Sequence, residues 1–132
     1  MASYRTREGA ITASDSFTSL GSLYGQASSA SVQVPANTSA IVGIIATVAT
    51  DSASNGATTF SCQLTGDGLT EQQTFVIGSQ GVDGTPASNG MTNLPMMLDV
   101  AIPVTASNQV AIAVAMDVDV GSAQAAVTLV FA

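Results

Sequence analysis

Lysine, histidine and tryptophan are absent from this sequence of 132 residues, and cysteine occurs once. Without histidine, the chain can form neither a Ser-His-Asp triad nor a Cys-His pair, and it has no imidazole to bind a metal. Without lysine, Schiff-base chemistry and the G-x-x-x-x-G-K phosphate loop are excluded. The single cysteine, Cys62, excludes an internal disulfide and a thiolate zinc cluster. These absences predict a protein that is not an enzyme and that uses no cofactor.

Positive charge is also scarce. Arg5 and Arg7 are the basic residues, whereas nine residues are acidic, so the net charge is -7. Binding to nucleic acid needs several basic side chains on one face, and anionic membranes attract basic segments. Neither nucleic acid nor a membrane is therefore an expected partner. Charged residues make up 8% of the chain, against about 25% in a typical soluble domain.

Long apolar runs are missing as well. No stretch approaches 18 consecutive apolar residues, so no membrane span is expected. The polar start MASYRTREGA lacks the apolar core of a signal peptide. We therefore expect the chain to fold inside the cell that makes it.

The composition that remains is typical of strands, because valine, isoleucine, threonine and serine dominate. Turn-forming groups such as SASNG and TGDG interrupt the apolar stretches at short intervals. We predict one all-β domain, a two-sheet antiparallel β-sandwich of jelly-roll type with about eight strands. Residues 1–14 are expected to form a short N-terminal arm, and residues 15–132 the sandwich. The expected strand segments are 15–24, 30–35, 39–50, 57–65, 71–78, 92–104, 108–120 and 123–132.

Alternation of side chains is clearest near the C-terminus. In MMLDVAIPV, one set of alternate residues is apolar and is predicted to face the core. Its members are Met96, Leu98, Val100, Ile102 and Val104. In VAIAVAMDVDV, a bulky set also alternates with a second set that is small and then acidic. The bulky set is Val110, Ile112, Val114, Met116, Val118 and Val120.

The small set of this last strand is unusual for an exposed face. Alanine loses no rotamer freedom when it is covered, and it lets another surface approach closely. We therefore predict that Ala111, Ala113 and Ala115 contact another subunit; a low-lysine composition imposed by genome or habitat is the alternative explanation. Arg5 and Arg7 are predicted to pair with acids of a neighbouring copy, the alternative being a solvated tail.

Asp117 and Asp119 lie two residues apart, on one side of the same predicted strand. Such a pair is compatible with a Ca²⁺ site if further oxygen ligands are near, and also with the acid pair of a glycosidase. Two acids that face solvent on an outer strand face are the interpretation that we favour. We therefore assign no metal site, and these two residues are weak candidates for one.

The whole pattern resembles the single jelly-roll structural proteins of viruses, which include capsid, decoration and spike-base domains. The features that carry the resemblance are the number of strands and four stretches: MASYRTREGAITAS, SVQVPANTSAIVGIIATVATD, NQVAIAVAMDVDV and AQAAVTLVFA. The resemblance implies a capsid or capsid-decoration subunit that is made in the host cytoplasm and resides in the virion. It also implies self-assembly as a trimer or higher oligomer, together with contacts to other capsid proteins. With two arginines in the arm, an outer-shell role is favoured over genome contact.

Two other hypotheses remain open. The first is a carbohydrate- or receptor-binding β-sandwich module whose tip is formed by loops 51–56 and 78–90. This module would lack the usual aromatic platform, because there is no tryptophan and both tyrosines lie before residue 25. The second is a hydrolase that uses carboxylates alone.

Overall fold

The computed structural model describes residues 2–11, 16–22, 30–51, 55–83, 91–118 and 122–132. Within these ranges all regular elements are strands, and no helix long and apolar enough to cross a membrane occurs there. The strands are β1 (Ser3–Ile11), β2 (Thr18–Ser19), β3 (Gly21–Ser22), β4 (Val32–Gln33), β5 (Ala40–Asp51), β6 (Asn55–Thr65), β7 (Gln73–Asp83), β8 (Met91–Pro103), β9 (Gln109–Met116) and β10 (Ser122–Phe131).

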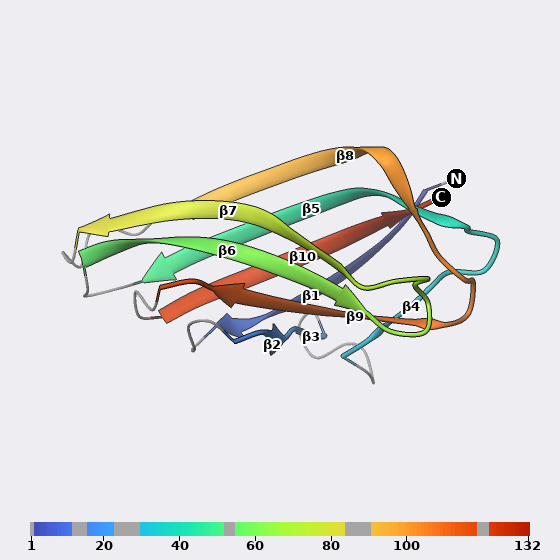
Figure 1. Ribbon diagram of the computed structural model, residues 1–132, viewed down its shortest axis with the longest axis horizontal. Helices are drawn as coiled ribbons and strands as arrows, with labels where there is room; N and C mark the ends of the chain where they lie inside the picture. Colours follow the sequence, from blue (N-terminus) through green and yellow to red (C-terminus); the bar gives the residue numbers. More distant parts are fainter. Residues whose placement is uncertain (1, 12–15, 23–29, 52–54, 84–90, 119–121) are drawn as a thin grey trace.

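The strands pair in a nested order. β1 pairs with β10, β2 and β4 pair with β9, β5 pairs with β8, and β6 pairs with β7, all antiparallel. The chain thus resembles one long hairpin wrapped into two layers (Figure 1). The first sheet has the order β3-β1-β10-β5-β8, and the second has the order β2-β9-β6-β7 with β4 also on β9. This arrangement is a jelly roll, so the expected fold class is confirmed.

The N-terminal segment differs from the expected arm. β1 pairs with β10 along its whole length, from Ser3 opposite Phe131 to Ile11 opposite Ala123. On its other side it pairs with β3. The segment is therefore an integral strand of the sandwich, and a division into arm 1–14 and domain 15–132 does not match the sheet. The polar side chains of β1 lack the apolar alternation that would identify a strand in the sequence. Its position in the sheet depends instead on backbone hydrogen bonds to β10, which is far away along the chain.

The core lies between the two inner faces. From the second sheet, Val110, Ile112, Val114 and Met116 of β9 are fully buried, which confirms the alternation expected at these positions. They share the core with Val127, Leu129 and Phe131 of β10. Full burial of a side chain of this size contributes about 1.5–3 kcal/mol, so the alternation of β9 and β10 is a main source of stability.

The apolar alternation of β8 fails at Val100, whose side chain is 83% exposed. The cause is a shift of register, because Ile41 pairs with Ile102 whereas Gly43 pairs with Met97. The extra residues on β8 form a bulge that breaks the period of two. Leu98, Ile102 and Val104 remain partly buried against the core, so Val100 is the exception in the expected set among the residues whose side chains are described.

One end of the sandwich is closed by turns that bond to one another. The β6–β7 connection lies on the start of β9, where the Gly68 N–H donates to the carbonyl of Gln109 at 2.8 Å. The Gln109 N–H in turn donates to Asp67 Oδ1 at 2.8 Å. Both chain ends lie at this same end of the molecule (Figure 1).

Candidate interaction face

The outer face of the second sheet is built from small and uncharged side chains. Ala115 of β9 lies opposite Ser61 of β6, and Ala113 lies opposite Gln63. Because the neighbouring residues of β9 point into the core, these alanines point outward. We call this surface the alanine face, and it comprises Ala111, Ala113 and Ala115 of β9 with Ser61, Gln63 and Thr65 of β6. Ala111 and Ala113 are partly exposed, whereas Ala115 is 7% exposed and is already covered within the subunit. The role of the alanines as an interface stays a prediction.

Two exposed hydrophobic residues flank the alanine face. Phe17 precedes β2, which pairs with β9, and its side chain is 40% exposed. On the other side, Val76 of β7 lies opposite Ser61 and is 57% exposed. A shallow hollow of about 210 Å³ is lined by Phe17, Ser61, Ala115, Met116 and Asp117. Sequence reasoning missed Phe17 as a neighbour of this face, because its position beside β9 depends on the pairing of β2.

Asp117 stabilises the junction between β9 and β6. Its Oδ1 atom accepts hydrogen bonds from the Thr59 N–H at 2.7 Å and from the Thr58 hydroxyl at 3.0 Å. The Thr59 N–H, followed by the Thr58 hydroxyl, lowers the pKa of this carboxyl below its usual value. Asp119, the other weak metal candidate, lies outside the described residues. Across the described part of the chain, no three acidic, histidine or cysteine side chains gather closely enough to hold a metal.

The two arginines have different surroundings. Arg7 is 8% exposed, and its guanidinium donates to the carbonyls of Ala30, Ser31 and Thr6 at 2.8–2.9 Å. Burial, followed by the nearby charge of Arg5, lowers its pKa. Arg7 therefore acts within the subunit, contrary to the expected contact with a neighbour, because it lies on the core side of β1. Arg5 is exposed, and its Nη1 donates to the carbonyl of Tyr4 at 2.9 Å.

Cys62 does not supply a nucleophile at this face. Its thiol is fully buried in the core. Burial raises its pKa to about 12, and the thiolate is the reactive form. The cysteine is therefore a small core residue, as the alternation of Phe60, Cys62 and Leu64 in the sequence indicates.

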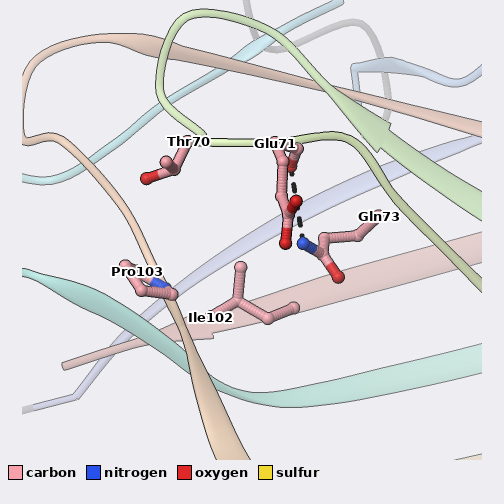
Figure 2. Close-up of a pocket in the computed structure, with 5 residues that line it drawn as sticks. All are labelled: Thr70, Glu71, Gln73, Ile102 and Pro103. Atoms are coloured by element: carbon pink, nitrogen blue, oxygen red, sulfur yellow. Dashed lines mark hydrogen bonds between the residues drawn. The ribbon is translucent and has the colours of Figure 1, made fainter.

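A second hollow, of about 170 Å³, lies at the end of the sandwich that carries the bonded turns. Thr70 and Glu71 of the β6–β7 connection, with Gln73 of β7, line one side of it (Figure 2). Ile102 and Pro103 of β8 line the other side. The Gln73 amide donates to the carbonyl of Glu71 at 3.5 Å. Sequence reasoning missed this hollow, since its two sides are far apart in the chain.

The expected loops 51–56 and 78–90 are shorter in the structure, because Asp51 belongs to β5, residues 55–56 belong to β6 and residues 78–83 belong to β7. The topology places the β5–β6 and β7–β8 connections at one end of the sandwich. Residues 52–54 and 84–90 lie outside the described residues. Of the two tyrosines, Tyr4 is exposed on β1, and Tyr24 lies outside the described residues. The carbohydrate- or receptor-binding alternative therefore stays a prediction.

Comparison with known proteins gives remote structural matches. No protein-family model and no curated protein sequence matches this chain. A structure of infectious bursal disease virus, Gx strain, matches with a TM-score of 0.44 and 11% identity, over 99% of this chain and 31% of the other. A nora virus structure matches with a TM-score of 0.35 and 7% identity, over 98% of this chain and 55% of the other.

Both of these neighbours are virus structures. The chain spans about a third of the first structure's chain and about half of the second's. Likeness at these identities and TM-scores assigns no function to this chain.

Proposed function

We propose that this chain is a non-enzymatic structural subunit of a virus particle, of either the capsid or a capsid decoration. It folds in the host cytoplasm, resides in the virion, and acts by assembling with copies of itself and with other capsid proteins. The observation that carries the proposal is the lack of charge on the alanine face.

A solvated face of a sheet normally carries lysine, glutamate and arginine. The six residues of the alanine face carry no charge, although the chain as a whole has a net charge of -7. Asp117 is at the margin of the face, and its carboxylate is already bonded to β6. Two copies can therefore approach here without strong like-charge repulsion, and small side chains lose little entropy when a partner covers them.

The exposed hydrophobic residues beside the alanine face favour association. Each Å² of apolar surface removed from water contributes about 25 cal/mol, and Phe17 and Val76 both offer such surface. A stable protein interface buries roughly 800 Å² of each partner. The subunit has 6683 Å² of accessible surface, of which an interface of this size would take roughly an eighth.

The test is the oligomeric state of the purified chain, measured by sedimentation velocity over a range of concentrations. We expect a trimer or larger assembly. Ala113→Arg places a large charged side chain in the middle of the alanine face and is expected to shift the assembly toward monomers. Ala36→Arg is the matched control, because it adds the same charge in an exposed turn after β4.

Circular dichroism and thermal melting establish that both variants remain folded. A wild-type chain that stays monomeric at every concentration contradicts the proposed function. Assembly that resists Ala113→Arg as well as Ala36→Arg contradicts the use of the alanine face.

A further inference from the structure

We propose that the hollow at Glu71 binds the guanidinium of Arg5 from a second copy of this chain. The inference deepens the proposed function, on which it rests, because it names a contact that joins one subunit to the next. The inference is supported by two oppositely charged groups, those of Arg5 and Glu71, which form few interactions with the described residues of their own subunit.

Arg5 is the basic residue whose guanidinium remains available for a partner. The sequence contains two basic side chains, and Arg7 is nearly buried against the carbonyls of Ala30 and Ser31. Arg5 is exposed, and the hydrogen bond of its guanidinium goes from Nη1 to the adjacent carbonyl of Tyr4. A guanidinium has five N–H donors, so most of its donors remain for a partner.

Glu71 is the matching anion. The structure describes the side chains of four acids: Glu8, Asp67, Glu71 and Asp117. Asp67 accepts the Gln109 N–H, Asp117 accepts Thr58 and Thr59, and Glu8 also has an interaction within the subunit. Among these four, Glu71 has the carboxylate that accepts no hydrogen bond from another described residue. It lines the 170 Å³ hollow instead.

The hollow suits the whole arginine side chain. A carboxylate and a guanidinium form two parallel hydrogen bonds in the best geometry, which lysine cannot reproduce. Thr70 adds a hydroxyl oxygen as a further acceptor, while Ile102 and Pro103 give an apolar wall (Figure 2). The three methylene groups of an arginine pack well on such a wall while its charged head stays at the carboxylate.

The positions of the two groups favour a contact between subunits. Arg5 is on β1, and the hollow is at the end of β8, on the same end of the sandwich (Figure 1). β10 and β5 lie between β1 and β8 in the sheet, a separation of three strand spacings or roughly 14 Å. Arg5 and the β8 wall of the hollow thus lie near opposite edges of the first sheet. A contact between different surfaces of two copies is head-to-tail, and it closes into a ring when the rotation allows.

The experiment measures the dissociation constant of the assembly by sedimentation velocity at low ionic strength. Glu71→Gln and Arg5→Gln are each expected to weaken assembly about tenfold or more, because each leaves one charge without its partner. Gln72→Arg is the matched control for Glu71→Gln. It changes the net charge by the same amount and sign at the adjacent exposed residue, and it is expected to leave the dissociation constant within about twofold of the wild type.

A double-mutant cycle tests whether the two groups touch each other. Arg5→Gln combined with Glu71→Gln is expected to weaken assembly little more than either change alone, since both remove the same contact. The exchange variant, with Arg5→Glu and Glu71→Arg in one chain, is expected to recover most of the assembly that either reversal alone abolishes.

The outcomes separate this inference from the proposed function. A wild-type chain that never assembles overturns both. A chain that assembles, but does so equally well with Glu71→Gln, overturns the inference and leaves the proposed function standing. Additive effects in the cycle, or an exchange variant that stays monomeric while melting like the wild type, also overturn the pairing of Arg5 with Glu71.

Discussion

Nη2 of Arg7 donates a hydrogen bond to the carbonyl oxygen of Ser31 across 2.9 Å. Its Nε donates to the carbonyl of Ala30 at the same distance. One side chain of β1 thus holds the segment that leads into β4. These bonds use a charged donor in a nearly buried position, which makes them stronger than bonds between neutral groups.

Replacing Arg7 with methionine is expected to lower the free energy of unfolding by roughly 2 kcal/mol, because the carbonyl oxygens of Thr6, Ala30 and Ser31 lose a charged donor. Arg5→Met is the control when both variants are measured on the dissociated subunit, since it removes the exposed arginine of the same strand and is then expected to change stability by less than about 0.5 kcal/mol. Urea denaturation measures both. Equal losses in the two variants would show that Arg7 does not hold the segment before β4.

Gly66 is expected to resist substitution. Its φ is +121°, and a Cβ atom built on it would lie 2.4 Å from the carbonyl oxygen of Gln109. Gly66→Ala therefore strains the backbone and pushes the β6–β7 connection off β9, at a cost of about 1–3 kcal/mol. Gly81→Ala is the control, because its nearest contact would be an ordinary 3.9 Å from the Gly56 oxygen. Thermal melting in which both variants match the wild type would contradict this account.

The stabilising effect of Asp117 is expected to depend on pH. Thr58 and Thr59 lower the pKa of this carboxyl in the folded state, so the ionised form favours folding. The difference in melting temperature between the wild type and Asp117→Ala should have its full value at pH values above the ordinary carboxyl pKa of 3.8. It should shrink as the pH falls through the lowered value of the folded state. Calorimetric scans from pH 7 to pH 2 measure it, and a difference that does not change with pH would argue against these bonds.

Cys62 is expected to be unreactive in the folded protein. Its pKa of about 12 leaves almost no thiolate at pH 8, and its side chain is fully buried. A thiol reagent such as Ellman's reagent should therefore modify it only after the chain is unfolded in guanidinium. Rapid modification of the native protein would show that the core opens at β6.

Much of the fold follows from local patterns in the sequence. β9 and β10 were predictable because each alternates large apolar residues with small or polar ones, which is the signature of a half-buried strand. β1 was not, since Arg5, Arg7 and Glu8 interrupt any apolar alternation. Its place comes from backbone pairing with β10, about which a single sequence says little.

The candidate contacts were less predictable than the strands. The outward orientation of Ala113 and Ala115 follows from the period of two along β9. The burial of Arg7 within the subunit depends on carbonyls more than twenty residues away. The hollow at Glu71 depends on how β8 passes the β6–β7 connection. The exposure of Val100 results from a register shift between strands. Such features arise from pairing over long distances, and local composition does not encode them.

The pairing of Ser3 with Phe131 has a consequence for how the chain reaches its fold. β1 leaves the ribosome before its main partner, β10, which is synthesised more than a hundred residues later. The nascent chain must therefore keep the backbone groups of β1 without this partner until β10 is synthesised. Long-range closure of this kind is slow, and it leaves strand edges open to neighbouring nascent chains. We expect the two sheets to close only after β10 has left the ribosome, and the yield in the producing cell to depend on how densely the message is translated.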